Sequence, residues 1–188
     1  MRVWFPLVLF FLAGLAQAGD IDAKVEAALA AESRPAADAE RDRNRKPLET
    51  LKFFGLEDDM TVLELIPGGG WYTRVLAPVL AEKGKLYVAI GTRRVSESVL
   101  TEPGFEKVEV IETDDNIRRP EGSRYYALDD FDFGISGVDM VLTFRNVHNF
   151  DPESRERMNR AVFDALESGG LYGVVDHTKR HMEPDNPE

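Results

Sequence analysis

Short apolar runs alternate with segments of helical periodicity along most of this chain, and this alternation restricts the folds that it can adopt. Continuous apolar runs indicate strands buried on both faces, as in a parallel sheet covered by helices. Because crossovers between parallel strands are right-handed, the sequence predicts an α/β fold with a doubly wound, Rossmann-like parallel sheet of about five strands. The predicted strands are residues 61–66, 86–90, 107–111, 138–144 and 171–175.

Two kinds of segment lie between these strands. Residues 71–82 and 94–100 have helical spacing, and a further helix is predicted where Asp151 can act as the cap and Pro152 as the first residue. The pair Gly169-Gly170 is expected to end that helix. Residues 113–132 lack a clear period, so the sequence predicts mostly loop there.

The first eighteen residues have the pattern of a secretory signal peptide. Arg2 is followed by an apolar run at residues 3–15, and Ala16 and Ala18 are the small residues that signal peptidase recognises. The apolar run is shorter than the roughly 20 residues of a membrane-spanning helix. We therefore expect cleavage before Gly19 and a periplasmic or secreted protein, with an uncleaved membrane anchor as the alternative.

Residues 19–55 are predicted to form N-terminal helices ahead of a Rossmann-like domain at residues 56–188. Helical spacing is present at residues 20–33 and again at residues 47–55. The charged segment between them, residues 36–46, indicates a solvated helix or linker.

Charge and cysteine content exclude several classes of function. The formal net charge is −11, and an acidic surface disfavours phosphate backbones, so we expect a small-molecule partner and no nucleic acid. The chain has 0 cysteines, which excludes disulfides, thiol nucleophiles and cysteine metal sites.

A glycine-rich turn follows the first predicted strand. In an open parallel sheet, ligands bind at the carboxyl ends of the strands near a topological switch point. Gly68, Gly69 and Gly70 allow a ligand to approach the backbone closely, and Glu64 precedes them inside the strand. The turn therefore indicates a ligand site, and the alternative is a tight strand-to-helix turn that binds nothing.

Residues 62–73 (VLELIPGGGWYT) resemble motif I of the class I S-adenosylmethionine (SAM)-dependent methyltransferases. They are most similar to a family of exported bacterial predicted methyltransferases. Further segments of this chain resemble that family in the same order: residues 53–56, 76–78, 142–149 and 169–177.

The resemblance implies a SAM-dependent methyltransferase that acts on an unknown small molecule. Glu64 would then lie near the amino group or ribose of the cofactor, and the glycines would hold its methionine part. The residues assigned to the cofactor site are Glu64, Gly68, Gly69, Gly70, Tyr72, Asp114 and Asn146.

Three departures from the family pattern concern this site. Ile66 stands where the first glycine of the turn is usual, and residues 90–91 offer no acid for the ribose hydroxyls. The acid that faces adenine is Asp114, Asp115 or Asp129, and the spacing does not choose between them. These departures leave open a non-catalytic module that binds a nucleoside-type ligand.

Thirteen residues follow Val175, and a crossover to a parallel strand takes about a dozen residues or more. We therefore expect the last two strands of the methyltransferase fold to be missing from this chain. The fifth strand should then lie at the edge of the sheet, where it can mediate self-association.

The histidines suggest where a reaction would take place. His148 follows the fourth predicted strand and is the candidate general base, since imidazole can exchange protons near neutral pH. A backbone hydrogen-bonding role is its alternative. No metal ligand is assigned, although His148, Asp176 and His177 leave a metal-site protein as a third hypothesis; His181 shares helical spacing with His177.

Overall fold

The computed structural model describes the backbone of residues 14–113 and 116–177, and the side chains from residue 21 onward within those ranges. The chain divides into two compact units, Met1–Glu57 and Asp58–Glu188. In the parts that the structure describes, no helix is long and apolar enough to cross a membrane. Each unit is described by itself below.

The first unit is helical. In α1, Ile21, Val25 and Ala28 are buried, at the spacing of one helix face. Helix α4 ends at Gly55, whose φ of 74° is the left-handed conformation that commonly terminates helices. The charged segment predicted as a solvated helix or linker forms the single-turn helices α2 and α3. The helices are α1 (Gly14–Leu29), α2 (Ala36–Ala39), α3 (Asp42–Arg45) and α4 (Pro47–Phe54).

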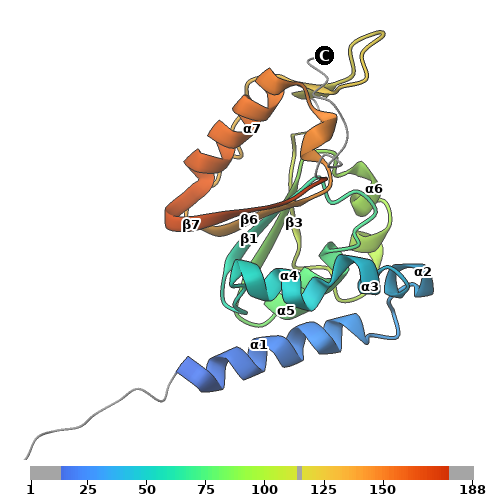
Figure 1. The fold of residues 1–188 in the computed structure, drawn as a ribbon, viewed down its shortest axis with the longest axis vertical. Coiled ribbons are helices and arrows are strands. Elements are labelled where there is room, and N and C mark those ends of the chain that lie inside the picture. The colour runs from blue at the N-terminus through green and yellow to red at the C-terminus, as the bar shows by residue number, and fades with distance from the viewer. Residues whose placement is uncertain (1–13, 114–115, 178–188) are drawn as a thin grey trace, which may run out of the picture. The chain divides into compact units, whose positions relative to one another are not determined.

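The second unit is built on a five-stranded sheet whose order is β3-β2-β1-β6-β7, with every neighbouring pair parallel (Figure 1). The predicted doubly wound parallel sheet is confirmed, and the first predicted strand lies at its centre. The last predicted strand lies at one edge, as expected. The strands are β1 (Thr61–Leu65), β2 (Lys85–Ala89), β3 (Glu109–Ile111), β6 (Val138–Phe144) and β7 (Leu166–Val175).

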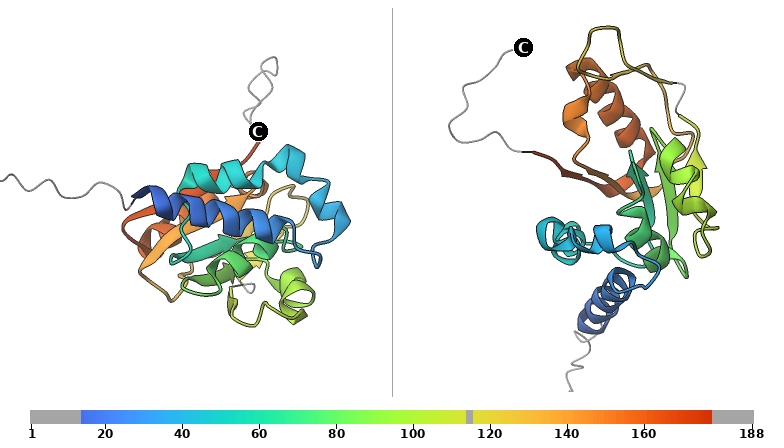
Figure 2. Two further views of the ribbon diagram at one scale, coloured as in Figure 1. Left: turned by 90° about the horizontal axis from the view of Figure 1, so that it is seen from below. Right: turned by 90° about the vertical axis from the view of Figure 1, so that its right-hand side faces the viewer.

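Helices cover both faces of this sheet. Successive strand residues point to opposite sides, so the apolar strands need cover on both. Leu63 and Leu65 of β1 belong to the core cluster that includes residues of α7. Glu64, between them, points to the other face and bonds Thr73 at the start of α5. Figure 2 shows α7 and α6 on opposite sides of the strands. These helices are α5 (Thr73–Leu80), α6 (Arg93–Ser96) and α7 (Pro152–Ala165), with 3₁₀ turns η1 (Val99–Thr101) and η3 (Val147–Asn149).

The segment predicted as mostly loop contains a small antiparallel ribbon. Strands β4 (Ile117–Arg118) and β5 (Ala127–Leu128) pair with each other, apart from the main sheet. The buried Ser154 hydroxyl accepts a hydrogen bond from the Leu128 amide at 2.8 Å, which fastens the ribbon to α7. Strands of two residues are too short to show a period of two, so the sequence did not indicate them.

The prediction that Gly169-Gly170 ends the last helix is wrong. Helix α7 ends at Ala165, and both glycines lie inside β7. The register shifts in this region, since Val138 pairs with Leu166 but Met140 pairs with Leu171. The glycines therefore accommodate a bulge rather than a helix end, which is the other common use of glycine near a strand. The cap predicted at the opposite end is present, with the Ser154 amide donating to the Asp151 side chain.

Candidate functional site

The turn after β1 holds backbone conformations that favour glycine. Gly68 and Gly70 have φ values of 59° and 79°. A Cβ atom on Gly70 would lie 2.5 Å from Val99 Cγ2, whereas one on Gly68 would meet nothing within 4 Å. Gly70 is therefore required by packing, and Gly68 borders open space that a ligand can enter.

Ile66, the residue in place of the usual first glycine, adopts the conformation that a glycine there would allow. Its φ is 58°, which is strained for a β-branched residue. Its amide donates to Ala89 O of β2 at 2.9 Å, so the turn remains tied to the sheet. Ile66 therefore holds the backbone in the left-handed conformation that glycine adopts without strain.

The same strain recurs on the neighbouring strands. Ile90 follows β2 with a φ of 63°, and Arg145 follows β6 with a φ of 62°. Together with Ile66 they are the first residues after three adjacent strands of the sheet. Non-glycine residues in this region cost energy and cluster at ligand sites, so the carboxyl edge is the candidate functional edge.

Glu64 is almost completely buried and accepts a 2.6 Å hydrogen bond from the Thr73 hydroxyl. Burial raises the pKa of Glu64 from 4.5 to about 7, although the bond from Thr73 opposes the rise. Glu64 therefore lies beneath the turn as an acid that can be neutral near pH 7. Thr73, which the sequence did not single out, is its partner.

Tyr72 lies against the sheet at the start of α5. Its ring stacks on the Phe144 ring, with 3.4 Å between centroids and 10° between planes, and Tyr72 is only 4% exposed. Trp71 packs edge-on against Tyr72. Both rings therefore help to build the floor of this edge, and a cofactor would meet little of the Tyr72 surface in this arrangement.

Asn146 connects the end of β6 to the turn after β1. Its side-chain nitrogen donates to Ile66 O at 3.1 Å and to Phe144 O at 2.9 Å. The two segments are 80 residues apart in sequence, so this bond fixes their spacing at the candidate site.

His148, Asp176 and His177 form a cluster where β6 and β7 end. The centroids of the two histidine rings are 4.8 Å apart, because these residues follow parallel neighbouring strands. His148 Nδ1 lies 2.6 Å from Asp176 Oδ1, and Asp176 Oδ2 accepts from the His148 amide. Partial burial of Asp176 opposes ionisation, but hydrogen bonds from the His177 amide and from His148 outweigh it and lower the pKa of Asp176.

The three acids considered for adenine and one arginine remain to be placed. Asp114, assigned to adenine, and its neighbour Asp115 lie outside the described residues. Asp129, the third candidate, is exposed and pairs with Arg118 at 2.9 Å. Arg145, which the sequence pattern did not single out, places Nη2 3.5 Å from His177 Nε2. Its position directly after a strand is the signal that could have identified it.

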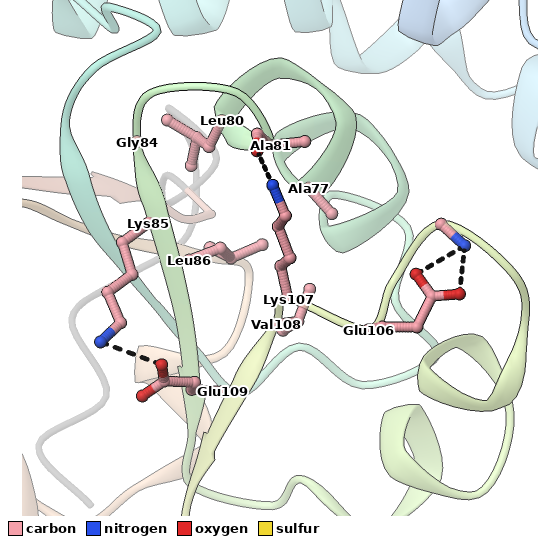
Figure 3. A pocket seen from close by; sticks show the side chains of 11 residues that line it. Ala77, Leu80, Ala81, Gly84, Lys85, Leu86, Glu106, Lys107, Val108 and Glu109 are labelled. Carbon is pink, nitrogen blue, oxygen red and sulfur yellow. Dashed lines mark hydrogen bonds and ion pairs between the residues drawn. The ribbon is translucent and has the colours of Figure 1, made fainter.

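A cavity of about 300 Å³ lies at the opposite edge of the sheet, where β2 begins (Figure 3). Its charged side chains bond within the protein: Lys85 pairs with Glu109 at 2.9 Å, and Lys107 donates to Ala81 O at 2.7 Å. These ammonium groups are committed to protein partners, and none of the predicted site residues lines this cavity.

Solved structures of SAM-dependent methyltransferases match the fold of this chain. One from Aquifex aeolicus matches with a TM-score of 0.57 and 21% identity, over 87% of this chain and 77% of its own. The DhpI-SAM-HEP complex matches with a TM-score of 0.51 and 18% identity, over 94% of this chain and 76% of its own. No family model and no curated sequence matches the chain. The second unit has the Rossmann-like fold of class I SAM-dependent methyltransferases.

Proposed function

We propose that this protein is a SAM-dependent methyltransferase that acts on a small molecule. The observation that carries the proposal is the convergence of three segments at one edge of a methyltransferase fold. Asn146 bonds the glycine turn to the end of β6, and Asp176 bonds the end of β7 to His148. A cofactor site and a proton acceptor would therefore adjoin one another.

The residues proposed to hold the cofactor fit that task in three respects. Gly68 faces open space, so a ligand can reach its backbone. Glu64 has a pKa of about 7 and lies under the turn. Asn146 holds the turn in place through Ile66 O. Gly69, Gly70 and Asp114 are proposed to border the cofactor as well, and Tyr72 to support the site from below through its stacking on Phe144. Bound SAM supplies a methyl group already activated on a sulfonium.

His148 is proposed to take the proton that an acceptor hydroxyl or amine loses. Asp176 accepts from Nδ1–H, which leaves the lone pair of the neutral ring on Nε2. The His148 side chain is 44% exposed, so an acceptor can reach this nitrogen. Asp176 would fix the ring orientation and stabilise the charge that forms on protonation.

One observation favours the alternative of a non-catalytic module. At the end of β2, Ile90 is fully buried and its amide donates to the Thr113 hydroxyl at 2.8 Å. Ile90 has no carboxylate that could bind the ribose hydroxyls, and its amide is already bonded to Thr113. Weak cofactor binding without turnover would be the behaviour of such a module.

Transfer of a labelled methyl group from SAM to a panel of small phenols, amines and carboxylates tests the proposal. We expect transfer to at least one acceptor and a loss of about 100-fold or more in kcat for His148→Gln, with SAM binding unchanged. His181→Gln is the control and should retain activity. Full activity of His148→Gln would refute the role of His148, and binding without transfer would favour the module.

We also propose that the protein is exported and that the mature chain begins at Gly19. The support is the sequence of residues 1–18, with Ala16 and Ala18 at the recognised positions. N-terminal sequencing of the protein from a periplasmic or culture fraction should begin at Gly19. Recovery of chains that retain residues 1–18 would contradict this prediction.

A further inference from the structure

We propose that His148, Asp176 and His177 form a binding site for a divalent transition-metal ion. Each of the three offers one ligand atom, and these atoms all lie within 4.8 Å of one another. The proposal rests on this cluster alone and is independent of the proposed methyl transfer.

The fold explains why these ligands converge. Strands β6 and β7 are parallel neighbours, with Phe144 opposite Val175, so the residues after them leave the same edge side by side. The 3₁₀ turn η3 brings His148 back toward β7. Hydrogen bonds from the backbone amides of His148 and His177, at 3.0 and 2.7 Å, hold the Asp176 carboxylate in place. The backbone therefore holds the central ligand, Asp176, in position, which reduces the entropy lost when the ligands are ordered around an ion.

The ligand set indicates which ions would bind. Two imidazoles and one carboxylate suit Zn²⁺, Fe²⁺ and related transition metals, whereas Mg²⁺ prefers an all-oxygen shell. Three protein ligands also leave a coordination position for water or another ligand. Zn²⁺ is therefore the appropriate probe, and Mg²⁺ the appropriate comparison.

Binding requires a small adjustment of the side chains. His148 Nδ1 and Asp176 Oδ1 are 2.6 Å apart, which is a hydrogen-bond distance. Two ligands with bonds of about 2.0–2.1 Å to one tetrahedral ion stand about 3.3 Å apart. The three ligand atoms, which lie within 4.8 Å of one another, must therefore adjust to this separation, and the exposed side chains of His148 and His177 can make the shifts.

Arg145 is the charged group that opposes the ion. Its guanidinium lies 3.5 Å from His177 Nε2, and the residue is exposed. A cation at the cluster would therefore displace the Arg145 side chain toward solvent. Replacing this charge should tighten metal binding, which a purely structural role of the cluster does not predict.

Metal binding and the proposed proton transfer use the same histidine. An ion bound to His148 occupies the neutral imidazole, which must be free to accept a proton in the proposed methyl transfer. If the proposed function holds, Zn²⁺ should inhibit methyl transfer in proportion to occupancy of the site. Calorimetric binding of Zn²⁺ does not depend on that outcome, so the two proposals can fail separately.

The test is a calorimetric titration of Zn²⁺ into the full chain, purified without a histidine tag. We expect one ion per chain, no heat from Mg²⁺, and at least about tenfold weaker Zn²⁺ binding for His148→Gln, Asp176→Asn and His177→Gln. Arg145→Gln should bind Zn²⁺ several-fold more tightly.

Two controls keep the result interpretable. His181→Gln replaces the remaining histidine and should leave Zn²⁺ binding unchanged, and circular dichroism of each variant reports whether it is folded. No binding by the wild-type chain, or equal binding by a folded His148→Gln and His177→Gln, would overturn the proposal. Loss of binding only in His181→Gln would overturn it as well.

Discussion

At the scale of single residues, backbone strain directly after three strands marks the candidate functional edge. Ile66, Ile90 and Arg145 have φ values between 58° and 63°. Each such conformation costs roughly 1–3 kcal/mol and persists only where surrounding contacts impose it. The bonds to Ala89, Thr113 and Val175 are those contacts, since each fixes the amide of one strained residue.

Gly70 and Gly69 provide a matched pair for the turn. Gly70→Ala places Cβ 2.5 Å from Val99 Cγ2 at a φ of 79°, so we expect a loss of about 2–4 kcal/mol in the free energy of unfolding. A Cβ on Gly69 lies 3.5 Å from Arg94 Nη2, so Gly69→Ala should change it by about 0.5 kcal/mol or less. Urea denaturation measures both, and equal effects would contradict the packing described here.

Glu64 should make stability depend on pH. Its pKa is raised from 4.5 to about 7 in the folded chain, so the folded state binds the proton more tightly than the unfolded state. The protonated form is therefore stabilising below pH 4.5, and this contribution is lost as the pH rises to about 7. The loss amounts to about 3 kcal/mol.

Urea denaturation between pH 4.5 and 8 checks this dependence by difference. The free energy of unfolding of the wild type should fall relative to that of Glu64→Gln across that window. Above the window, the difference between the two proteins should stay constant. Glu167→Gln changes an exposed glutamate and should follow the wild type. Parallel curves for wild type and Glu64→Gln would show that Glu64 has no raised pKa.

At the scale of elements, β7 is the strand most open to partners. It forms one edge of the sheet, with Leu171 and Val174 exposed by 39% and 42%. Long apolar edge strands promote association unless something covers them. Among the residues that the structure describes, no strand pairs with its outer side.

We therefore expect the chain to self-associate through β7 and Val174→Lys to weaken that association about tenfold or more, because a lysine on an edge strand opposes pairing. Phe163→Lys is the control, since Phe163 is 78% exposed but lies on α7. Sedimentation velocity over a range of concentrations measures the effect. A monomeric wild type, or equal dissociation of both variants, would contradict this prediction.

The elements also show which features the sequence can specify. Strand β6 was predicted with its observed bounds, because six of its seven positions are buried and leave an apolar run with few exceptions. The bulge in β7 was mistaken for a helix end, because glycine serves both purposes and only the pairing with β6 distinguishes them. The ribbon β4–β5 depends on a bond from Leu128 to Ser154, which is not local in sequence.

For the whole molecule, strand order follows from general rules of parallel sheets, so the neighbours of the first strand were predictable. In this order His148 and His177 follow two adjacent parallel strands and therefore lie at one edge of the sheet. The partners of these residues were not predictable, since the Asp176 hydrogen bonds and the Arg145 contact depend on how two loops close. The fold thus determines which residues meet, and the loops determine how they bond.

Calorimetric titration of SAM into the full chain and into Gly68→Asn tests most directly whether the glycine turn after β1 binds the cofactor. Asparagine tolerates a φ of 59° but fills the open space beside the turn. We expect wild-type binding on the order of 10–100 μM, weakened by the missing ribose acid, and at least about tenfold weaker binding by Gly68→Asn. No wild-type binding at millimolar SAM, or equal binding by a folded Gly68→Asn, would contradict a cofactor site at this turn.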